Sequence, residues 1–245
     1  MAIIAVYNIK GGVGKTATSV NLSYMSALTG NSTLLCDLDP QGSSSYYFRV
    51  KAKKKFSADR FLQGGSRVER SIRGTDYEHL DILPADFSYR NMDINLNEMK
   101  KSKKRLQRVL VPLADEYRHI FLDCPPNITL LSENIFYAAD MILIPFIPTT
   151  LSMLSFGKLL DFFKKSSIEQ SKLFVVFSMV EQKKKIHQET MRHFEGKKRI
   201  LKTYVPYVTD IEKMGVYRQP VPAYLPDSKA GHIYAELWRE IEQNI

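Results

Sequence analysis

A glycine-rich loop directly after an apolar segment constrains the fold of this chain more than any other feature. Residues 10–16 read Lys-Gly-Gly-Val-Gly-Lys-Thr, the segment Ala2–Asn8 precedes them, and apolar residues at helical spacing begin at Thr16. A strand, a glycine loop and a helix in this order aim backbone N–H groups and a helix N-terminus at phosphate oxygens. The loop therefore predicts a phosphate-binding site in which Lys15 pairs with the β and γ phosphates and Thr16 ligates Mg²⁺. A glycine turn without a ligand is disfavoured, because the Gly-Lys-Thr ending and both flanking segments agree with this context.

Short apolar segments alternate with segments of helical spacing along the rest of the chain. This rhythm predicts an α/β fold with a mainly parallel, twisted sheet and helices on both of its faces. We expect strands at Ala2–Asn8, Thr33–Asp37, Leu80–Leu83, His119–Asp123, Met141–Pro145, Leu173–Ser178 and Leu201–Val205. We expect helices at Thr16–Leu28, Leu96–Leu113, Leu151–Lys165, His187–Phe194 and Ser228–Gln243, and loops with short helices over Gln41–Gly74. The sequence shows no convincing domain boundary, so residues 1–245 are expected to form a single domain.

Composition limits the classes of partner. With 245 residues, 44% of them hydrophobic, the chain is long enough for one large α/β domain. Its formal net charge of +9 favours a polyanionic partner, either nucleic acid or an anionic membrane surface, and charge alone does not choose between them. Cys36 and Cys124 lie in apolar runs, which suits a reducing compartment and argues against a disulfide framework or a thiolate metal site. The sequence carries no signal peptide and no run of about 18 apolar residues, so we expect a cytoplasmic protein.

Two further motifs place carboxylates at strand ends. The segment Leu34–Gly42 contains Asp37 and Asp39, and alternation along an extended chain puts both side chains on the same side. The segment His119–Pro126 is an apolar strand that ends in Asp123 and two prolines, which matches a Walker B strand. Carboxylates that face a triphosphate need a cation between them or a water to orient, so Asp123 is predicted to hold Mg²⁺ through a coordinated water. Ordinary strand-end caps are the alternative for Asp37 and Asp39.

The glycine loop also departs from the ordinary phosphate-loop pattern. Ile9 stands where that pattern has a glycine, and an additional lysine, Lys10, opens the loop. With these motifs the sequence resembles the deviant Walker A ATPases of the ParA and MinD family over nearly its whole length, and most closely their ParA and Soj type. The resemblance implies a P-loop NTPase fold, ATP and Mg²⁺ as cofactors, and a homodimer that sandwiches ATP. It also implies that Lys10 reaches the partner's phosphates, that Asp39 positions the attacking water, and that Asp37 joins the Mg²⁺ shell or the switch region.

The remaining nucleotide contacts are expected from the loop backbone and from two late segments. Backbone N–H groups surround the phosphates in such a loop, here those of Gly11, Gly12, Val13 and Gly14. Relatives carry a second threonine where this chain has Ala17, which therefore offers only its backbone N–H. The resemblance places adenine recognition at Met179 and in the Val205–Val208 stretch, with Pro206 and Val208 as candidates, although Met and Val are more often core residues.

Basic residues cluster at Arg49–Lys55, Lys100–Arg108 and Lys183–Lys202. A solvated face is the usual explanation of such a run, and Lys100–Arg108 has the pattern of a surface helix. ParA-type relatives bind DNA through basic residues in the C-terminal half of the dimer. The resemblance therefore gives candidates for DNA contacts that would be independent of sequence and sensitive to salt, namely Lys184, Lys198, Arg199, Arg218 and Lys229.

The function implied by the resemblance is that of a ParA-like ATPase, which positions or segregates a plasmid, a chromosome region or a protein assembly. ATP would join two subunits, the dimer would bind DNA without sequence preference, and a ParB-like or cargo-adaptor partner would stimulate slow hydrolysis. The protein would be cytoplasmic, and nucleoid-associated when ATP is bound. Because the first strand begins at residue 2, we expect no N-terminal helix-turn-helix.

Two other classes of protein share this fold. A MinD-like ATPase that acts on a membrane surface ends in a basic amphipathic helix, whereas the segment His232–Gln243 is acidic on its polar face and has the apolar spacing of a core helix. An electron donor or cluster-assembly scaffold needs cysteines that bridge the dimer, and Cys36 and Cys124 both lie within strand motifs. The sequence therefore disfavours a membrane or an iron–sulfur cluster as the partner.

Overall fold

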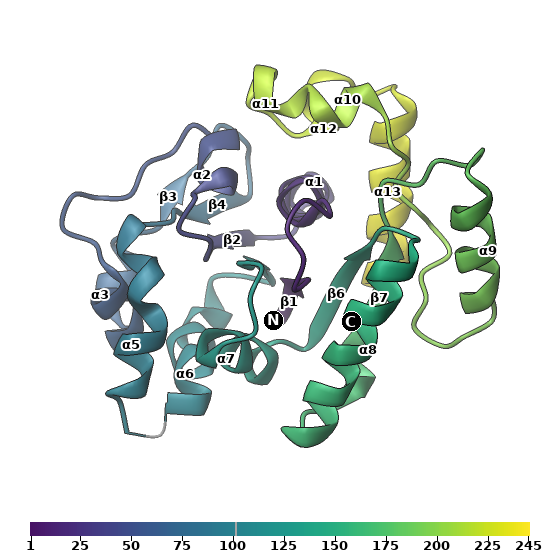
Figure 1. The fold of residues 1–245 in the computed structure, drawn as a ribbon. Helices are drawn as coiled ribbons and strands as arrows, with labels where there is room; N and C mark the ends of the chain where they lie inside the picture. The colour runs from purple at the N-terminus through teal and green to yellow at the C-terminus, as the bar shows by residue number, and fades with distance from the viewer. Residues whose placement is uncertain (101) are drawn as a thin grey trace.

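One sheet of seven strands runs through the part of the chain that the computed structural model describes, residues 1–100 and 102–245 (Figure 1). The strand order is β3-β4-β2-β5-β1-β6-β7, and all neighbours are parallel except the antiparallel pair β3 and β4. The mainly parallel α/β sheet predicted from the sequence is confirmed. The strand bounds are β1 Ala2–Val6, β2 Thr33–Asp37, β3 Arg73–Gly74, β4 Leu80–Leu83, β5 His119–Asp123, β6 Met141–Phe146 and β7 Leu173–Phe177.

The central strands are buried because each of their faces has its own hydrophobic core. Successive side chains of a strand point to opposite faces. Ile3 and Ala5 of β1 accordingly belong to one core cluster, and Ile4 and Val6 belong to the other. A strand that is covered on both faces has no polar side to present, which explains the unbroken apolar runs in the sequence.

Helices cover both faces of the sheet (Figure 1). Leu22 of α1 and Trp238 of α13 pack in one core, whereas Phe61 of α3, Ile135 of α7 and Phe163 of α8 pack in the other. The helix bounds are α1 Lys15–Leu28, α2 Ser43–Tyr47, α3 Ala58–Gln63, α4 Ser66–Glu69, α5 Met92–Asn97, α6 Arg105–Leu110, α7 Leu130–Ala138, α8 Thr150–Lys165, α9 Lys185–Phe194, α10 Thr209–Glu212, α11 Met214–Tyr217, α12 Val221–Tyr224 and α13 Lys229–Glu242. Four 3₁₀ turns complete the described chain, η1 Phe87–Asn91, η2 Ser102–Lys104, η3 Val111–Asp115 and η4 Gln170–Lys172.

The single helix predicted over Leu96–Leu113 is wrong. Lys101 of that stretch lies outside the described residues, and the rest is divided among α5, η2, α6 and η3. The side-chain oxygen of Asn134 accepts the backbone N–H groups of Arg105 and Leu106, at 2.9 and 3.2 Å, so α6 starts anew at this point. Pro112 in the following 3₁₀ turn has no N–H with which to continue α6.

The strand predicted at Leu201–Val205 is also wrong. Leu201 and Val205 donate backbone hydrogen bonds of 2.9 and 2.8 Å to β7, but the residues between them turn away from the sheet. The carboxylate of Glu240 in α13 accepts the N–H groups of Lys202 and Thr203 at 2.6 and 2.9 Å. This segment therefore links the sheet edge to α13. The strand β3 and the helices α7, α10, α11 and α12 were not predicted. The irregular Gln41–Gly74 region contains short helices as expected.

Candidate nucleotide site

The glycine loop lies between β1 and α1, and its backbone conformation requires glycine at two positions. Gly12 and Gly14 have φ angles of 71° and 87°, which glycine adopts without the steric penalty of a side chain. A Cβ atom on Gly14 would also lie 3.0 Å from Ser178 Oγ. Gly14 directly precedes α1, so the loop ends at the N-terminus of this helix, where anions are stabilised.

Asn8 holds the start of the loop in place. Its side-chain oxygen accepts the N–H of Lys10 at 2.9 Å, and its side-chain amide donates to the carbonyl of Pro145, at the end of β6, at 2.8 Å. Asn8 was read from the sequence only as the last residue of a strand. An asparagine that bonds the N–H two residues later is the common signature of an Asx-turn, so the sequence did contain a signal for this role.

Lys15, predicted to contact phosphate, is buried and folded back over its own loop. Its Nζ donates to the backbone carbonyl of Lys10 at 2.8 Å, and only 7% of the residue is exposed. Burial lowers the pKa of Lys15, and the nearby carboxylates of Asp123 and Asp39 oppose that shift. A poorly hydrated ammonium next to the loop is placed to interact strongly with an anion that displaces the carbonyl contact.

Asp37 and Asp123 lie side by side at the ends of two neighbouring strands. They are register partners in the β2–β5 pair, and both are fully buried. Burial raises the pKa of both carboxyl groups, and the charge of Asp123 raises the pKa of Asp37 further. Hydrogen bonds from Ser44 and Thr16 act against the shift at Asp123. Two carboxyl groups so close together favour a site that receives a cation.

The residues that hold these carboxylates come from α1 and α2. Ser44 and Ser19 donate to Asp123 at 2.7 and 3.3 Å. Ser45 donates to one oxygen of Asp37 through both its backbone N–H and its hydroxyl, at 2.8 and 2.7 Å. The other oxygen, Asp37 Oδ1, is buried and has no hydrogen-bond partner among the described residues. The role of these serines was not predicted from the sequence, although Gly42 before three serines is a residue pattern that can start a helix.

Asp39, predicted to position a water, lies at the half-buried rim of the site. One of its carboxylate oxygens accepts the N–H of Gln41 at 2.9 Å, which fixes the side chain against the start of the α2 loop. Its charge acts on the pKa values of both Lys15 and Asp123, so the carboxylate is electrostatically part of the same site.

The predicted metal ligands Thr16, Asp37 and Asp123 do converge. Thr16 lies close enough to Asp123 to lower the pKa of that carboxyl group, and Asp123 faces Asp37 across the β2–β5 pair. Within the described residues, no group of three or more His, Cys, Asp or Glu side chains is arranged to hold a metal ion. A hydroxyl and one or two carboxylates provide hard oxygen ligands, which are the type that Mg²⁺ prefers.

Of the candidate adenine contacts, Met179 lies near the same loop. Met179 follows β7, has a φ of 52°, and its methyl group would lie 3.8 Å from a Cβ on Gly14. Pro206 forms an isolated bridge with Val180, and Val208 directly precedes α10. Ala17, in the first turn of α1, packs against the core with its small side chain. Gly11 and Gly12 are exposed, whereas Val13 is buried.

The candidate DNA contacts are distributed over several elements. Lys184 forms an ion pair with Glu181, and Lys229 is exposed at the start of α13. Lys198 and Arg199 follow α9 and line one cavity. Arg218 packs instead on α2, with its guanidinium 4.4 Å from the centre of the Tyr46 ring and its Nε 3.0 Å from the Tyr46 carbonyl.

A Gly-Lys-Thr loop between β1 and α1, with Asp123 at the end of the adjacent parallel strand, defines a P-loop nucleoside triphosphatase. A family model described as an AAA domain matches residues 1–175, and the chain belongs to this family, in its ParA and MinD branch.

The chain is similar to several relatives over nearly its whole length. It is 29% identical to the sporulation initiation inhibitor protein Soj of Bacillus subtilis (strain 168) over 251 residues, which cover 99% of this chain and 98% of Soj. A putative plasmid partition protein from Borrelia burgdorferi B31, solved with AMPPNP, superposes with a TM-score of 0.87 at 20% identity and covers 100% of this chain and 99% of that one. Cobyrinic acid a,c-diamide synthase from Mycobacterium smegmatis, solved with an ATP analogue and magnesium, superposes with a TM-score of 0.84 at 22% identity. This superposition covers 100% of this chain and 95% of the synthase chain.

Proposed function

We propose that this protein is a ParA-like ATPase that binds ATP with Mg²⁺, dimerises around the nucleotide and positions or segregates a cargo on DNA. The observation that carries the proposal is the loop with a lysine at each end, Lys10 and Lys15, in which Lys15 lies near Asp123 of the buried carboxylate pair Asp37 and Asp123. The similarity to Soj over nearly the full length of both chains supports the same conclusion. One ATPase domain over residues 1–245 is part of this proposal.

The site fits ATP and Mg²⁺ chemically. Asp37 Oδ1 is a buried acceptor without a hydrogen bond among the described residues, and two adjacent carboxyl groups with raised pKa values lack a neighbouring cation other than Lys15. Thr16, Asp123 and Asp37 are the residues that would hold the metal, directly or through water. Mg²⁺, when bound, supplies positive charge between the phosphates and these carboxylates.

Three side chains of this protein have separate roles in hydrolysis. Lys15 binds the β and γ phosphates after it leaves the carbonyl of Lys10. Lys10 acts on the nucleotide of the other subunit and stabilises charge that develops during phosphoryl transfer. Asp39 orients the attacking water from the rim of the site. The loop backbone from Gly11 to Ala17 surrounds the phosphates, while Met179, Pro206 and Val208 border the base.

The proposed cycle couples ATP to DNA. ATP favours the dimer, the dimer binds DNA through backbone phosphates without sequence preference, and a ParB-like or cargo-adaptor protein stimulates hydrolysis and release. Lys184, Lys198, Arg199, Arg218 and Lys229 are candidates for these contacts. The protein is then cytoplasmic, and nucleoid-associated in its ATP-bound state.

A MinD-like function on a membrane surface is the alternative, and α13 argues against it. Tyr234, Leu237, Trp238 and Ile241 of this helix are at most 1% exposed and pack in the core with α1. The apolar face of α13 is therefore buried in the core and does not face a membrane. In the described chain, which lacks only residue 101, we find no helix with the length and apolar character needed to cross a bilayer.

The test compares wild type with Lys10→Ala, Lys15→Ala and Asp39→Ala, and with Lys158→Ala on the exposed surface of α8 as a matched control. We expect wild type and the control to dimerise with ATP in light scattering and to retain random-sequence duplex DNA at low salt. Lys15→Ala should lose nucleotide binding, Lys10→Ala should bind ATP without forming the active dimer, and Asp39→Ala should bind ATP and hydrolyse it far more slowly. If both lysine variants retain DNA as well as wild type does, the nucleotide-switch proposal is wrong.

A further inference from the structure

Two segments outside the nucleotide site are strongly basic, Arg49–Arg73 and Lys100–Arg108. Between Arg49 and Arg73 the sequence has nine basic and two acidic residues, a net charge of +7 within a total of +9. Residues 124–245, which include all five candidate DNA contacts, have 16 basic and 13 acidic residues, a net charge of only +3. The strongest electrostatic attraction for a polyanion is therefore expected near residues 49–73.

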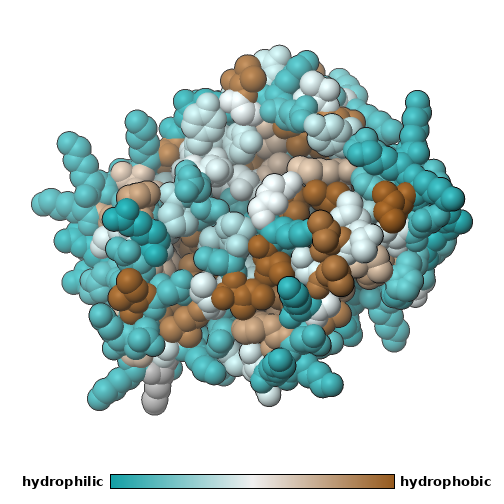
Figure 2. Space-filling view, viewed as in Figure 1, coloured by the Kyte–Doolittle hydropathy of each residue, from teal (hydrophilic) through white to brown (hydrophobic). Residues whose placement is uncertain are grey.

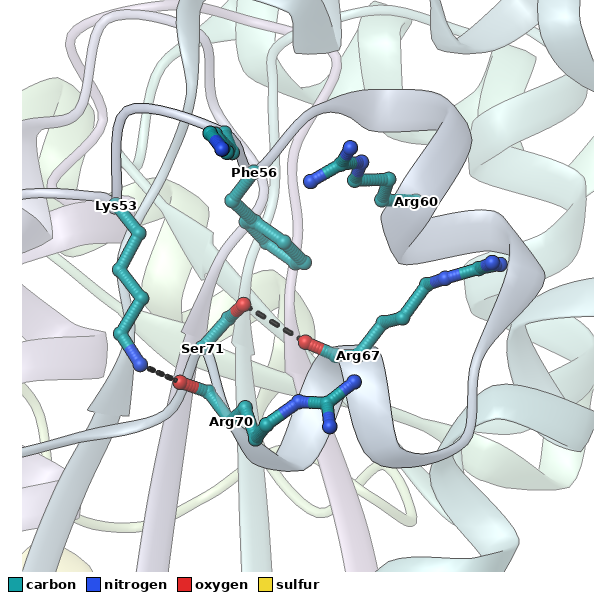
Figure 3. A pocket seen from close by; sticks show the side chains of 7 residues that line it. Lys53, Phe56, Arg60, Arg67, Arg70 and Ser71 are labelled. Atoms are coloured by element: carbon teal, nitrogen blue, oxygen red, sulfur yellow. Dashed lines mark hydrogen bonds between the residues drawn. The ribbon is translucent and has the colours of Figure 1, made fainter.

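Part of this segment folds into a basic pocket (Figure 3). We use this name for the cavity of about 180 Å³ that is lined by Lys53, Lys55, Phe56, Arg60, Arg67, Arg70 and Ser71. In Figure 3 the cationic side chains come from α3, α4 and the flanking loops, and they surround the ring of Phe56. Figure 2 shows long hydrophilic side chains projecting from this left-hand edge of the molecule.

The backbone around the basic pocket is held in place by the fold. Phe56 is 5% exposed and makes edge contacts with Phe61 and Tyr89. Ser71 Oγ donates to the carbonyl of Arg67 at 2.7 Å, and Lys53 Nζ donates to the carbonyl of Arg70. The pocket is thus built on buried aromatic residues and fixed turns, while its charged groups remain exposed.

The cations of the basic pocket have no carboxylate partners in the part of the chain that is described. None of its five lysine and arginine side chains forms an ion pair there, whereas Arg49, outside the pocket, pairs with Asp76. Like charges that share a small cavity repel one another, and an anion that enters the cavity relieves this repulsion. Arginine also offers a planar fork of donors that matches two phosphate oxygens.

A second basic run lies next to the basic pocket. Arg105, at the start of α6, donates through Nε and Nη2 to the carbonyls of Leu62 and Gln63, at 2.5 and 3.1 Å. These carbonyls belong to the end of α3, the helix that carries Arg60 of the pocket. Lys103, Lys104 and Arg108 are exposed beside this contact. The positive surface therefore extends from the pocket over η2 and α6, which suits an extended polyanion better than a single small anion.

The chemistry of this surface favours nucleic acid over a protein or a membrane. Among the described residues from 49 to 73 and from 102 to 110, no large hydrophobic side chain is exposed. The exposed ones on the neighbouring segments are Tyr46, Phe87, Ile94 and Val111. Protein interfaces place apolar and aromatic anchors at their centre, and amphipathic membrane segments bury apolar residues in the lipid. Nucleic-acid interfaces are instead polar and rich in positive charge.

We propose that the basic pocket, together with the exposed cations of η2 and α6, binds backbone phosphates of duplex DNA and is the main DNA contact of this protein. This inference rests on the DNA binding in the proposed function and moves its principal site from the C-terminal half to the part of the chain between β2 and β5. Binding through phosphates is independent of sequence and falls steeply with salt.

The experiment compares two full-length variants from which equal charge has been removed. The first carries Arg60→Gln, Arg67→Gln and Arg70→Gln, and the second carries Lys184→Gln, Lys198→Gln and Lys229→Gln. Binding of a fluorescent random-sequence duplex is measured with ATP over a series of salt concentrations. Circular dichroism and binding of a fluorescent ATP analogue verify the fold. A third variant carries Arg60→Lys, Arg67→Lys and Arg70→Lys, which keeps the charge and should keep most of the affinity.

We expect the pocket variant to bind DNA at least about ten-fold more weakly at low salt and to lower the slope of log K against log salt by about three, one for each phosphate contact. The C-terminal variant should change much less. If instead the C-terminal variant loses DNA and the pocket variant does not, this inference is overturned while the proposed function stands. If wild type binds no duplex in any nucleotide state, both this inference and the DNA binding in the proposed function are wrong. Loss of binding to phosphatidylserine vesicles with unchanged DNA binding would assign the pocket to a membrane and also overturn the inference.

Discussion

Ser44 Oγ donates a hydrogen bond of 2.7 Å to Asp123 Oδ2, and this bond joins the first turn of α2 to the end of β5. The next residue, Ser45, bonds Asp37 in the same way at the end of β2. At its other end, α2 contacts α11, because Arg218 donates to the carbonyl of Tyr46. A helix of five residues therefore connects both buried carboxylates of the candidate site with the C-terminal part of the chain.

Removal of the Ser44 hydroxyl should alter the titration of the site. Burial raises the pKa of Asp123, and the hydrogen bond from Ser44 limits that increase. In Ser44→Ala the pKa of Asp123 rises further, so the ionised carboxylate that Mg²⁺ requires forms only at higher pH. We expect the acidic limb of the pH profile of ATP hydrolysis to move to higher pH. The control is Ser43→Ala, one residue earlier, and coincident profiles for the two variants would contradict the prediction.

The contact between Arg218 and Tyr46 should stabilise the fold. The guanidinium lies 4.4 Å from the ring centre, a geometry worth about 0.5–1 kcal/mol at an exposed site. A double-mutant cycle with Arg218→Ala and Tyr46→Leu, measured by urea unfolding, should give a coupling free energy of that size. Lys213→Ala serves as a control on the same surface. A coupling near zero would leave Arg218 free for the DNA contact expected from the sequence.

Asp37→Asn should make the protein more stable at neutral pH while impairing its activity. The folded state raises the pKa of Asp37 above its ordinary value of 3.8, mainly through burial. The stability from this group is fully present below that value and is lost as the pH rises through the raised pKa of the folded state. An asparagine side chain at this position does not titrate, so the variant would lack this loss, and its amide oxygen could still accept the two bonds from Ser45.

Thermal unfolding of wild type and Asp37→Asn is compared across pH without nucleotide or Mg²⁺. We expect the melting temperature of the variant to increase steadily relative to that of wild type as the pH rises from about 4 to 8. The exposed substitution Asp161→Asn in α8 should show no such trend. A stability difference that does not depend on pH would refute the titration of Asp37, whereas slower ATP hydrolysis in the variant follows from the loss of a carboxylate near Mg²⁺.

The sequence was sufficient for the six parallel strands and the phosphate loop for a physical reason. Runs such as Ile120–Leu122 are buried on both faces, so their apolar character is continuous and their ends are sharp. The bounds predicted for β2, β4 and β5 match the structure residue for residue. Gly12 and Gly14 are required by the positive φ angles of the loop backbone. This requirement is local, so a short sequence motif is enough to predict it.

The sequence was insufficient where distant side chains decide the local structure. Asn134 of α7 starts a new helix at Arg105, and Glu240 of α13 draws Lys202 away from the sheet, although neither partner is near in sequence. The basic pocket shows the same limit. Lys53 belongs to a visible basic run, but Arg60 and Arg67 join it only because α3 and α4 fold around Phe56.

Two helical glycines should respond to alanine in opposite directions. Gly157 lies inside α8, and an added Cβ would meet no atom within 4 Å. Gly157→Ala should therefore stabilise the protein by about 0.5–1 kcal/mol, because alanine loses less backbone entropy in a helix.

Gly231 lies in the first turn of α13, where a Cβ would be only 2.7 Å from the carbonyl oxygen of Pro226 and 3.0 Å from that of Leu225. Backbone atoms cannot rotate away as a side chain can, so Gly231→Ala should cost about 1–3 kcal/mol. In thermal unfolding, the first variant should melt above wild type and the second below it, by about 2–4 °C per kcal/mol. An increase in melting temperature for both variants would show that α13 shifts to accept the methyl group and that its close packing on the Leu225–Pro226 turn is dispensable.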